Sequence, residues 1–194
     1  MPDDFTTIVS GLPRSGTSLM MQMLQAGGMP LLTDGQRAPD EHNPRGYFEH
    51  EGVKHSRNDL SWLRDANGKT VKVIHLLLLH LAVRRSYRVV FMLRDMQEVI
   101  ASQRAMLKQQ GRAGAPLTDA KLAEIFEAQL TQVRQWLVER EHFQVLYINH
   151  SDLIQYPLNT AGQINEFLGG HLATAKMADA VNPVLYRQRK SSVT

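Results

Sequence analysis

The residues from Gly11 to Ser18 are the part of this sequence best suited to chemistry. The segment Gly11-Leu12-Pro13-Arg14-Ser15-Gly16-Thr17-Ser18 follows a short β-branched run and precedes an apolar helical pattern. Gly11 and Gly16 have the spacing of the nucleotide phosphate loop G-x-x-x-x-G-K-[ST], in which backbone N–H groups and a helix N-terminus hold phosphate oxygens. Thr17 replaces the lysine of that loop, and a cation, Arg14, stands three residues earlier. Because the missing lysine would reach the β- and γ-phosphates of a nucleoside triphosphate, its loss argues against ATP or GTP turnover.

This loop resembles the 5′-phosphosulfate loop of the sulfotransferase family, P-[KR]-[ST]-G-T-[ST] after a strand, as in a small bacterial-type domain. Its arginine is more similar to the tyrosylprotein branch than to the cytosolic aryl branch. The resemblance implies a sulfotransferase that moves a sulfuryl group from 3′-phosphoadenosine 5′-phosphosulfate to an acceptor hydroxyl or amine by in-line displacement. It also implies that Arg14 contacts the sulfuryl group and the bridging oxygen. The residues that would bind the 5′-phosphate are Ser15, Gly16, Thr17 and Ser18.

The same family carries a 3′-phosphate motif, in which a strand is followed by an arginine and, eight positions later, by a serine. Arg94 ends the apolar run 87–93, and Ser102 lies eight residues further on. The resemblance implies that both bind the 3′-phosphate, since arginine supplies a fixed charge with forked donors and serine a hydroxyl. Met96 and Met106 stand where the family usually has a proline and a further arginine, which leaves Arg104 as the candidate substitute.

Two further fragments extend the resemblance over nearly the whole chain. The stretch 147–153, with Pro157, is similar to the family's strand and Y-E-D-L segment, and His150 occupies its usual tyrosine position. The basic tail around Arg187 and Arg189 resembles a C-terminal piece that closes over the nucleotide.

The transfer reaction needs a base that takes the acceptor proton, and the family uses Glu or His for this step in different branches. We favour Glu49, because the flanking Tyr47 and Phe48 would partly desolvate its carboxylate and raise its pKa. The alternative is that Glu49 begins a solvent-facing helix as an N-terminal carboxylate. The other candidates for the base are Asp34, Glu41 and His50. We interpret Lys72 as an exposed lysine at a strand end, with a second cation near the sulfuryl group as the alternative.

The pattern along the chain predicts an α/β fold of three layers, with a central parallel sheet like that of phosphate-loop nucleoside triphosphate hydrolases. Buried strands alternate with helical patterns, which favours a parallel sheet covered on both faces, with ligands at the carboxyl ends of its strands. We expect one domain over residues 1–194. The predicted strands are 6–10, 71–74, 87–93 and 143–148, and the predicted helices are 19–26, 47–64 in large part, a short Leu-rich helix after 74, 95–109 and 119–140.

Two loops, 29–46 and 109–116, are rich in Gly, Pro and polar residues and are expected to build the acceptor pocket. The acceptor class stays open among small molecules, carbohydrates and peptides. Two other functions stay open as well. The chain could be an ATP-dependent phosphate-loop kinase for a small molecule, with Asp95 as the Mg²⁺ carboxylate, or a non-catalytic nucleotide-binding domain.

Composition limits the partners and the compartment. The net charge of +3 and the pI of about 9.3 suit an anionic ligand, while the basic residues are scattered and indicate no nucleic acid partner. The chain has no cysteine, and neither His50 with His55 nor His75 with His80 has the spacing of a helical metal pair, so we expect no metal. The longest apolar stretch, 73–83, is too short to span a bilayer. We therefore expect a soluble, cytoplasmic protein.

Overall fold

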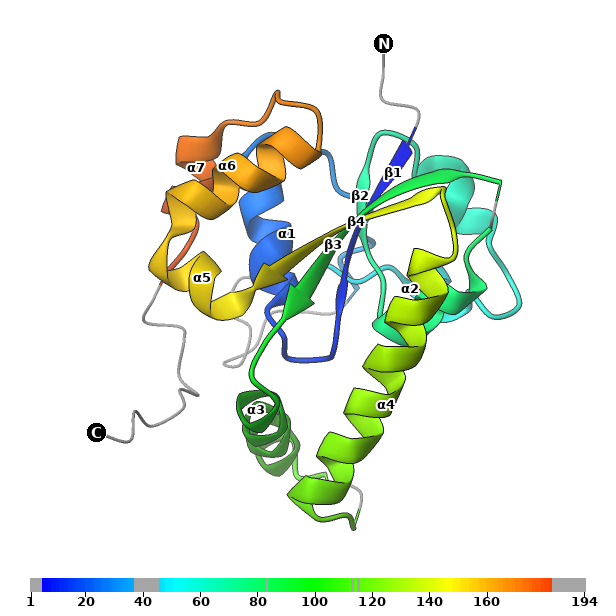
Figure 1. Cartoon of the computed structure of the whole chain (residues 1–194), viewed down its shortest axis with the longest axis vertical. Helices are drawn as coiled ribbons and strands as arrows, with labels where there is room; N and C mark the ends of the chain where they lie inside the picture. Colours follow the sequence, from blue (N-terminus) through cyan, green and yellow to red (C-terminus); the bar gives the residue numbers. More distant parts are fainter. Residues whose placement is uncertain (1–4, 37–45, 83, 113, 115, 183–194) are drawn as a thin grey trace.

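A parallel four-stranded sheet forms the centre of the molecule (Figure 1). The computed structural model describes residues 5–36, 46–82, 84–112, 114 and 116–182. Within these residues the strands have the order β2-β1-β3-β4, and every neighbouring pair is parallel. The four strands are β1 (Phe5–Gly11), β2 (Thr70–Lys72), β3 (Ser86–Leu93) and β4 (Phe143–Asn149). The predicted α/β fold with a central parallel sheet is confirmed.

Successive residues of the strands enter two separate apolar clusters, one on each face of the sheet. Ile8 belongs to the first cluster and Val9 to the second, because side chains alternate between the faces of a strand. The first cluster also takes in residues of the 3-10 helices η1 (Ser61–Asp65) and η2 (His75–His80) and of α4 (Asp119–Val138). The second is built with α1 (Thr17–Ala26), α5 (His150–Gln155), α6 (Pro157–Phe167) and α7 (Thr174–Asp179), which lie together on the opposite side of the sheet from α4 (Figure 1). The three layers therefore result from the alternation of side chains between the two faces of the sheet.

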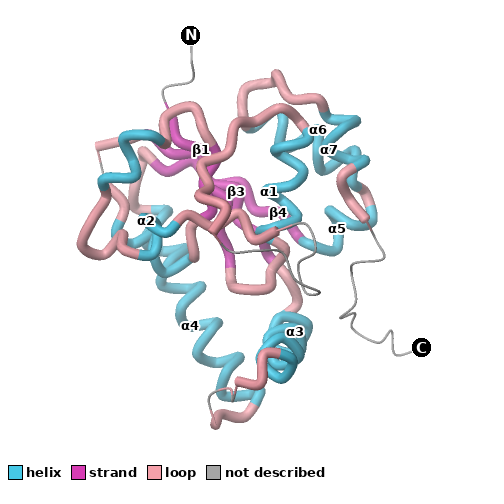
Figure 2. Tube along the Cα trace, turned by 180° about the vertical axis from the view of Figure 1, so that it is seen from behind, coloured by secondary structure: helices cyan, strands magenta, loops and turns pink. Residues whose placement is uncertain are grey.

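Helix α3 (Met96–Gln109) follows β3 and packs beside α4, and the two helices extend beyond the sheet (Figure 2). Asp95 is the N-cap of α3, since its carboxylate accepts hydrogen bonds from the backbone N–H groups of Gln97 and Glu98. None of the described helices is long and apolar enough to cross a membrane.

The prediction that 47–64 is mostly helical is wrong. Only α2 (Glu51–Lys54) and η1 are helical in this segment. Phe48 has a φ of 53°, outside the helical range, and the Asp59 side chain accepts from the backbone N–H of Ser61 to start a new turn. Trp62 and Leu63 are buried in the first cluster, so packing of these side chains overrides the helical periodicity.

Candidate functional site

The carboxyl ends of all four strands contribute to one region of the molecule. The phosphate-loop segment 11–18 follows β1, Lys72 ends β2, Arg94 follows β3 and His150 follows β4. The chain passes from β1 to β2 on one side and then to β3 on the other, so the strand order reverses between β1 and β3. In open parallel sheets this switch point is where ligands bind.

The loop between β1 and α1 has the backbone of an anion cradle. Arg14 and Gly16 have φ angles of 72° and 100°, and the N–H of Ser15 between them bonds to the carbonyl of Leu12 at 3.1 Å. The Ser15 hydroxyl is buried without a hydrogen-bond partner among the described residues, and no described side chain caps the N-terminus of α1. Successive N–H groups in such a turn, ahead of a helix N-terminus, favour a bound oxyanion.

Both loop glycines are required by close contacts. A Cβ added to Gly11 would lie 2.6 Å from the carbonyl oxygen of Met92 in β3. A Cβ added to Gly16 would lie 2.5 Å from Cδ2 of His150, so the imidazole packs directly against the loop. The loop is therefore fitted between the ends of β3 and β4.

Arg14 joins the loop to α3. Its Nε donates to the Ser102 Oγ at 3.0 Å, and its Nη1 lies 3.9 Å from the Met106 sulfur one turn further along the helix. Arg94 approaches from the other direction and donates from Nη1 to the Arg14 carbonyl oxygen at 3.0 Å. The structure thus brings together Arg14, Ser102 and Arg94, although they are far apart in the sequence.

Arg104 does not take the place of the arginine that Met106 replaces. Its guanidinium pairs with Asp119 and donates to the carbonyl of Leu117 at 2.9 Å, at the start of α4. The side chain is nearly half exposed. The prediction for Arg104 is wrong, because its nearest counter-charge lies across the α3–α4 connection.

Arg94 forms a buried ion pair that sequence reasoning missed. Its Nε donates to the Glu98 carboxylate at 2.9 Å, and the two side chains are only 10% and 7% exposed. The i, i+4 spacing of Arg94 and Glu98 across the start of α3 was the available signal. Asp95, the next residue, is exposed, and its side chain caps the helix.

His150 is 6% exposed and lies under the phosphate loop. Burial, reinforced by the nearby Arg94 charge, lowers the pKa of His150 to about 4, while Glu98 acts in the opposite direction. The imidazole is therefore neutral at ordinary pH.

Glu49 lies between two lysines rather than in a solvent-facing helix, since α2 begins only at Glu51. One carboxylate oxygen is 3.8 Å from the Lys72 Nζ and the other is 3.9 Å from the Lys54 Nζ. The Glu49 side chain is 25% exposed.

Lys72 connects Glu49 with the phosphate loop. Its Nζ donates to the Tyr47 carbonyl oxygen at 2.7 Å and lies 3.3 Å from the Ser18 Oγ. The side chain is only 13% exposed, so the interpretation of Lys72 as an exposed strand-end lysine is wrong. The Tyr47 carbonyl and the Glu49 carboxylate, both on the segment after Gly46, keep the Lys72 ammonium group largely buried.

Two of the other candidates for the base, Asp34 and His50, lie in the described part of the chain. The Asp34 carboxylate accepts from the backbone N–H groups of Gln36, at 3.0 Å, and Glu51, and these bonds lower the pKa of Asp34. Asp34 is therefore an ionised carboxylate that links the backbone near Gln36 to the backbone at Glu51. His50 precedes α2 without capping it by its side chain, and its ring lies against Gly52. Glu41 and the tail residues Arg187 and Arg189 lie outside the described residues.

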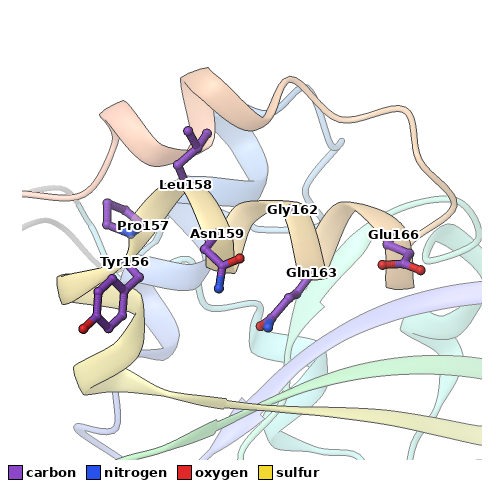
Figure 3. Close-up of a pocket in the computed structure, with 7 residues that line it drawn as sticks. All are labelled: Tyr156, Pro157, Leu158, Asn159, Gly162, Gln163 and Glu166. Atoms are coloured by element: carbon purple, nitrogen blue, oxygen red, sulfur yellow. The ribbon is translucent and has the colours of Figure 1, made fainter.

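A hollow lies along α6 (Figure 3). Tyr156 and Leu158 on its rim are each more than half exposed. All of its lining residues belong to the segment 156–166, so none of the predicted site residues takes part. In the described part of the chain, no group of three or more His, Asp or Glu side chains could hold a metal ion.

A parallel sheet with an anion cradle after its first strand defines a phosphate-loop type of α/β domain. The model of the sulfotransferase domain family matches residues 4–193, and the chain belongs to this family. Sulfuryl transfer is the chemistry that the family represents. Among solved structures, the chain is similar to the "Sulfotransferase Domain from the Curacin Biosynthetic Pathway", with 16% identity and a TM-score of 0.49, over 84% of this chain and 73% of that one. No curated protein matches the sequence.

Proposed function

We propose that this chain transfers a sulfuryl group from 3′-phosphoadenosine 5′-phosphosulfate to the hydroxyl or amine of an acceptor. One observation carries the proposal beyond family membership: the two predicted phosphate-binding segments meet. Arg14 bonds to Ser102 at 3.0 Å, and Arg94 bonds to the Arg14 carbonyl at 3.0 Å. Because the 3′- and 5′-phosphates of this donor are attached to one ribose, their binding groups must be near neighbours.

In this proposal the loop holds the 5′ end of the donor. Backbone N–H groups of Gly16 to Ser18 and the Ser15 hydroxyl bind the 5′-phosphate at the N-terminus of α1. Arg14 contacts the sulfuryl group and the bridging oxygen, on which negative charge grows as the sulfur–oxygen bond to the phosphate breaks. The 3′-phosphate binds to Arg94 and Ser102. The donor is the only co-substrate, and no metal has a role.

Glu49 is the proposed base. The acceptor oxygen or nitrogen attacks sulfur, its proton passes to the Glu49 carboxylate, and adenosine 3′,5′-bisphosphate leaves. Its position supports this role, since Lys72 lies within 3.8 Å of Glu49 and 3.3 Å of Ser18, between the carboxylate and the loop. Lys72 adds a second positive charge toward the transferring group. The acceptor is a small molecule, a carbohydrate or a peptide.

Two measurements test the proposal. Immobilised adenosine 3′,5′-bisphosphate should retain the protein without Mg²⁺, and free bisphosphate should elute it. Incubation with labelled donor and a panel of phenols, sugars, peptides and amines should then give an acceptor whose mass rises by one sulfuryl group. Retention on ATP that depends on Mg²⁺ would support a kinase instead, and binding without transfer to any acceptor would support a non-catalytic domain.

A further inference from the structure

The buried ion pair between Arg94 and Glu98 places a negative charge beside a proposed phosphate site. The Glu98 carboxylate accepts from the Arg94 Nε at 2.9 Å, and its side chain is 7% exposed. Such a charge repels an incoming phosphate, and a buried ion pair by itself is weak evidence for stability. The contribution of the Glu98 carboxylate therefore lies in its effect on the position of Arg94.

Glu98 stands in the first turn of α3, and its carboxylate contacts the guanidinium of Arg94, the residue just before the N-cap. Here Asp95 accepts from the N–H groups of Gln97, at 2.9 Å, and Glu98, at 3.3 Å, while the Glu98 carboxylate contacts Arg94. The Asp95 side chain caps the helix start, and the Glu98 carboxylate accepts from the Arg94 guanidinium.

The contact fixes the direction of the guanidinium fork. Glu98 holds the Nε edge of Arg94, and Nη1 reaches the Arg14 carbonyl at 3.0 Å. The guanidinium is planar, so these two contacts on different edges set the plane in which it can meet a phosphate. The same loop residue, Arg14, bonds to Ser102 at 3.0 Å. Glu98 thus acts on both groups proposed for the 3′-phosphate, directly on one and through the loop on the other.

We propose that Glu98 is a positioning residue that orients Arg94 for the 3′-phosphate of the donor. The inference rests on the proposed function, and it makes the enzyme's preference for 3′-phosphorylated nucleotides depend on the reach of the Glu98 carboxylate. Position, and not negative charge, is the property of Glu98 that matters, because the charge alone opposes phosphate binding.

Two substitutions separate position from charge. Glu98→Asp keeps the charge but shortens the side chain by one methylene, whereas Glu98→Gln keeps the length and an accepting oxygen but removes the charge. Titration calorimetry would measure the Kd of adenosine 3′,5′-bisphosphate and of adenosine 5′-phosphate for each full-length variant. Glu124→Asp and Glu124→Gln are the controls, because Glu124 pairs with Lys121 at 2.7 Å on the exposed face of α4.

We expect Glu98→Asp to weaken the bisphosphate about tenfold and the monophosphate less than about twofold, since one charge-assisted contact is misdirected. Glu98→Gln should bind the bisphosphate within about twofold of the unmodified protein, or more tightly. The Glu124 variants should leave both affinities unchanged.

Three outcomes would overturn the inference: unchanged bisphosphate affinity in Glu98→Asp, equal weakening of both nucleotides, or a loss in Glu98→Gln as large as in Glu98→Asp. Should Glu98→Asp fail to fold, Glu98→Gln decides, and a loss of more than about fivefold in bisphosphate affinity overturns the inference. A different result tests the proposed function separately. If the unmodified protein itself does not prefer the bisphosphate over the monophosphate, the proposed donor is wrong, whatever Glu98 does.

Discussion

Replacing Gly16 by alanine should damage the phosphate loop in two ways that can be measured apart. Gly16 has a φ of 100°, which costs an L-residue about 1–2 kcal/mol. The new Cβ would also lie 2.5 Å from Cδ2 of the buried His150 ring, and overpacking of this kind costs about 1–3 kcal/mol. The free energy of unfolding should therefore fall by about 2–5 kcal/mol in total.

Gly28 is a matched control for the backbone contribution. It has a φ of 98°, and a Cβ added there meets no atom within 4 Å. In urea unfolding, Gly28→Ala should lose only the backbone part, about 1–2 kcal/mol. The double variant Gly16→Ala/His150→Ala should then be more stable than the sum of its single changes predicts, by about 1–3 kcal/mol, since the ring that clashes is gone.

Two results would refute this reasoning. Equal destabilisation by Gly16→Ala and Gly28→Ala would show that the His150 contact is unimportant. Additivity of the double variant within about 0.5 kcal/mol would show that Gly16 and His150 do not interact.

Three further predictions concern activity and pH. Arg14→Ala should reduce kcat/KM by at least about 100-fold in the transfer assay, because the leaving group loses its counter-charge. The free energy of unfolding in urea should fall by only about 1–3 kcal/mol, through the lost bond to Ser102. Glu49→Gln should lower kcat by about 10²–10⁴-fold, whereas Asp34→Asn should keep most of the activity; similar activity of Glu49→Gln and the unmodified enzyme would exclude Glu49 as the base. The pKa of His150 is lowered from 6.5 to about 4, so the unfolded chain takes up this proton first and stability is lost as the pH falls from about 6.5 toward 4. Between pH 7 and pH 5 the unmodified protein should lose about 2 kcal/mol more than His150→Ala, as measured by urea unfolding; equal losses would contradict a buried, neutral imidazole.

The sheet was largely predictable because the apolar runs of its strands can be recognised in the sequence itself. The run 87–93 is apolar almost throughout, and it forms part of β3. Such a run indicates a strand covered on both faces. The segment 47–64 was mispredicted because its apolar residues suggested a helix, while Trp62 and Leu63 are fixed by packing from elsewhere in the chain. Local periodicity contains no information about that packing.

The candidate site was also predicted in part and missed in part. The loop 11–18 was found from its glycine spacing, and Arg94 and Ser102 from their resemblance to the family's motif; the structure brings them into contact. The burial of Lys72 could not be read from its neighbours, since its acceptor, the Tyr47 carbonyl, lies 25 residues away in the sequence. Arg104 was misassigned because its counter-charge, Asp119, belongs to the next helix. Long-range polar contacts of this kind produce no periodic pattern in the sequence.

The hydrogen-bond ladder between β1 and β3 sets the separation of the two segments proposed to bind the donor nucleotide. Gly11, the first residue of the loop, is paired with Met92, which lies two residues before Arg94. A slip of one residue in this ladder would shift the arginine along the sheet and turn its side chain to the opposite face. We therefore expect insertions or deletions inside either strand to abolish binding of the proposed donor.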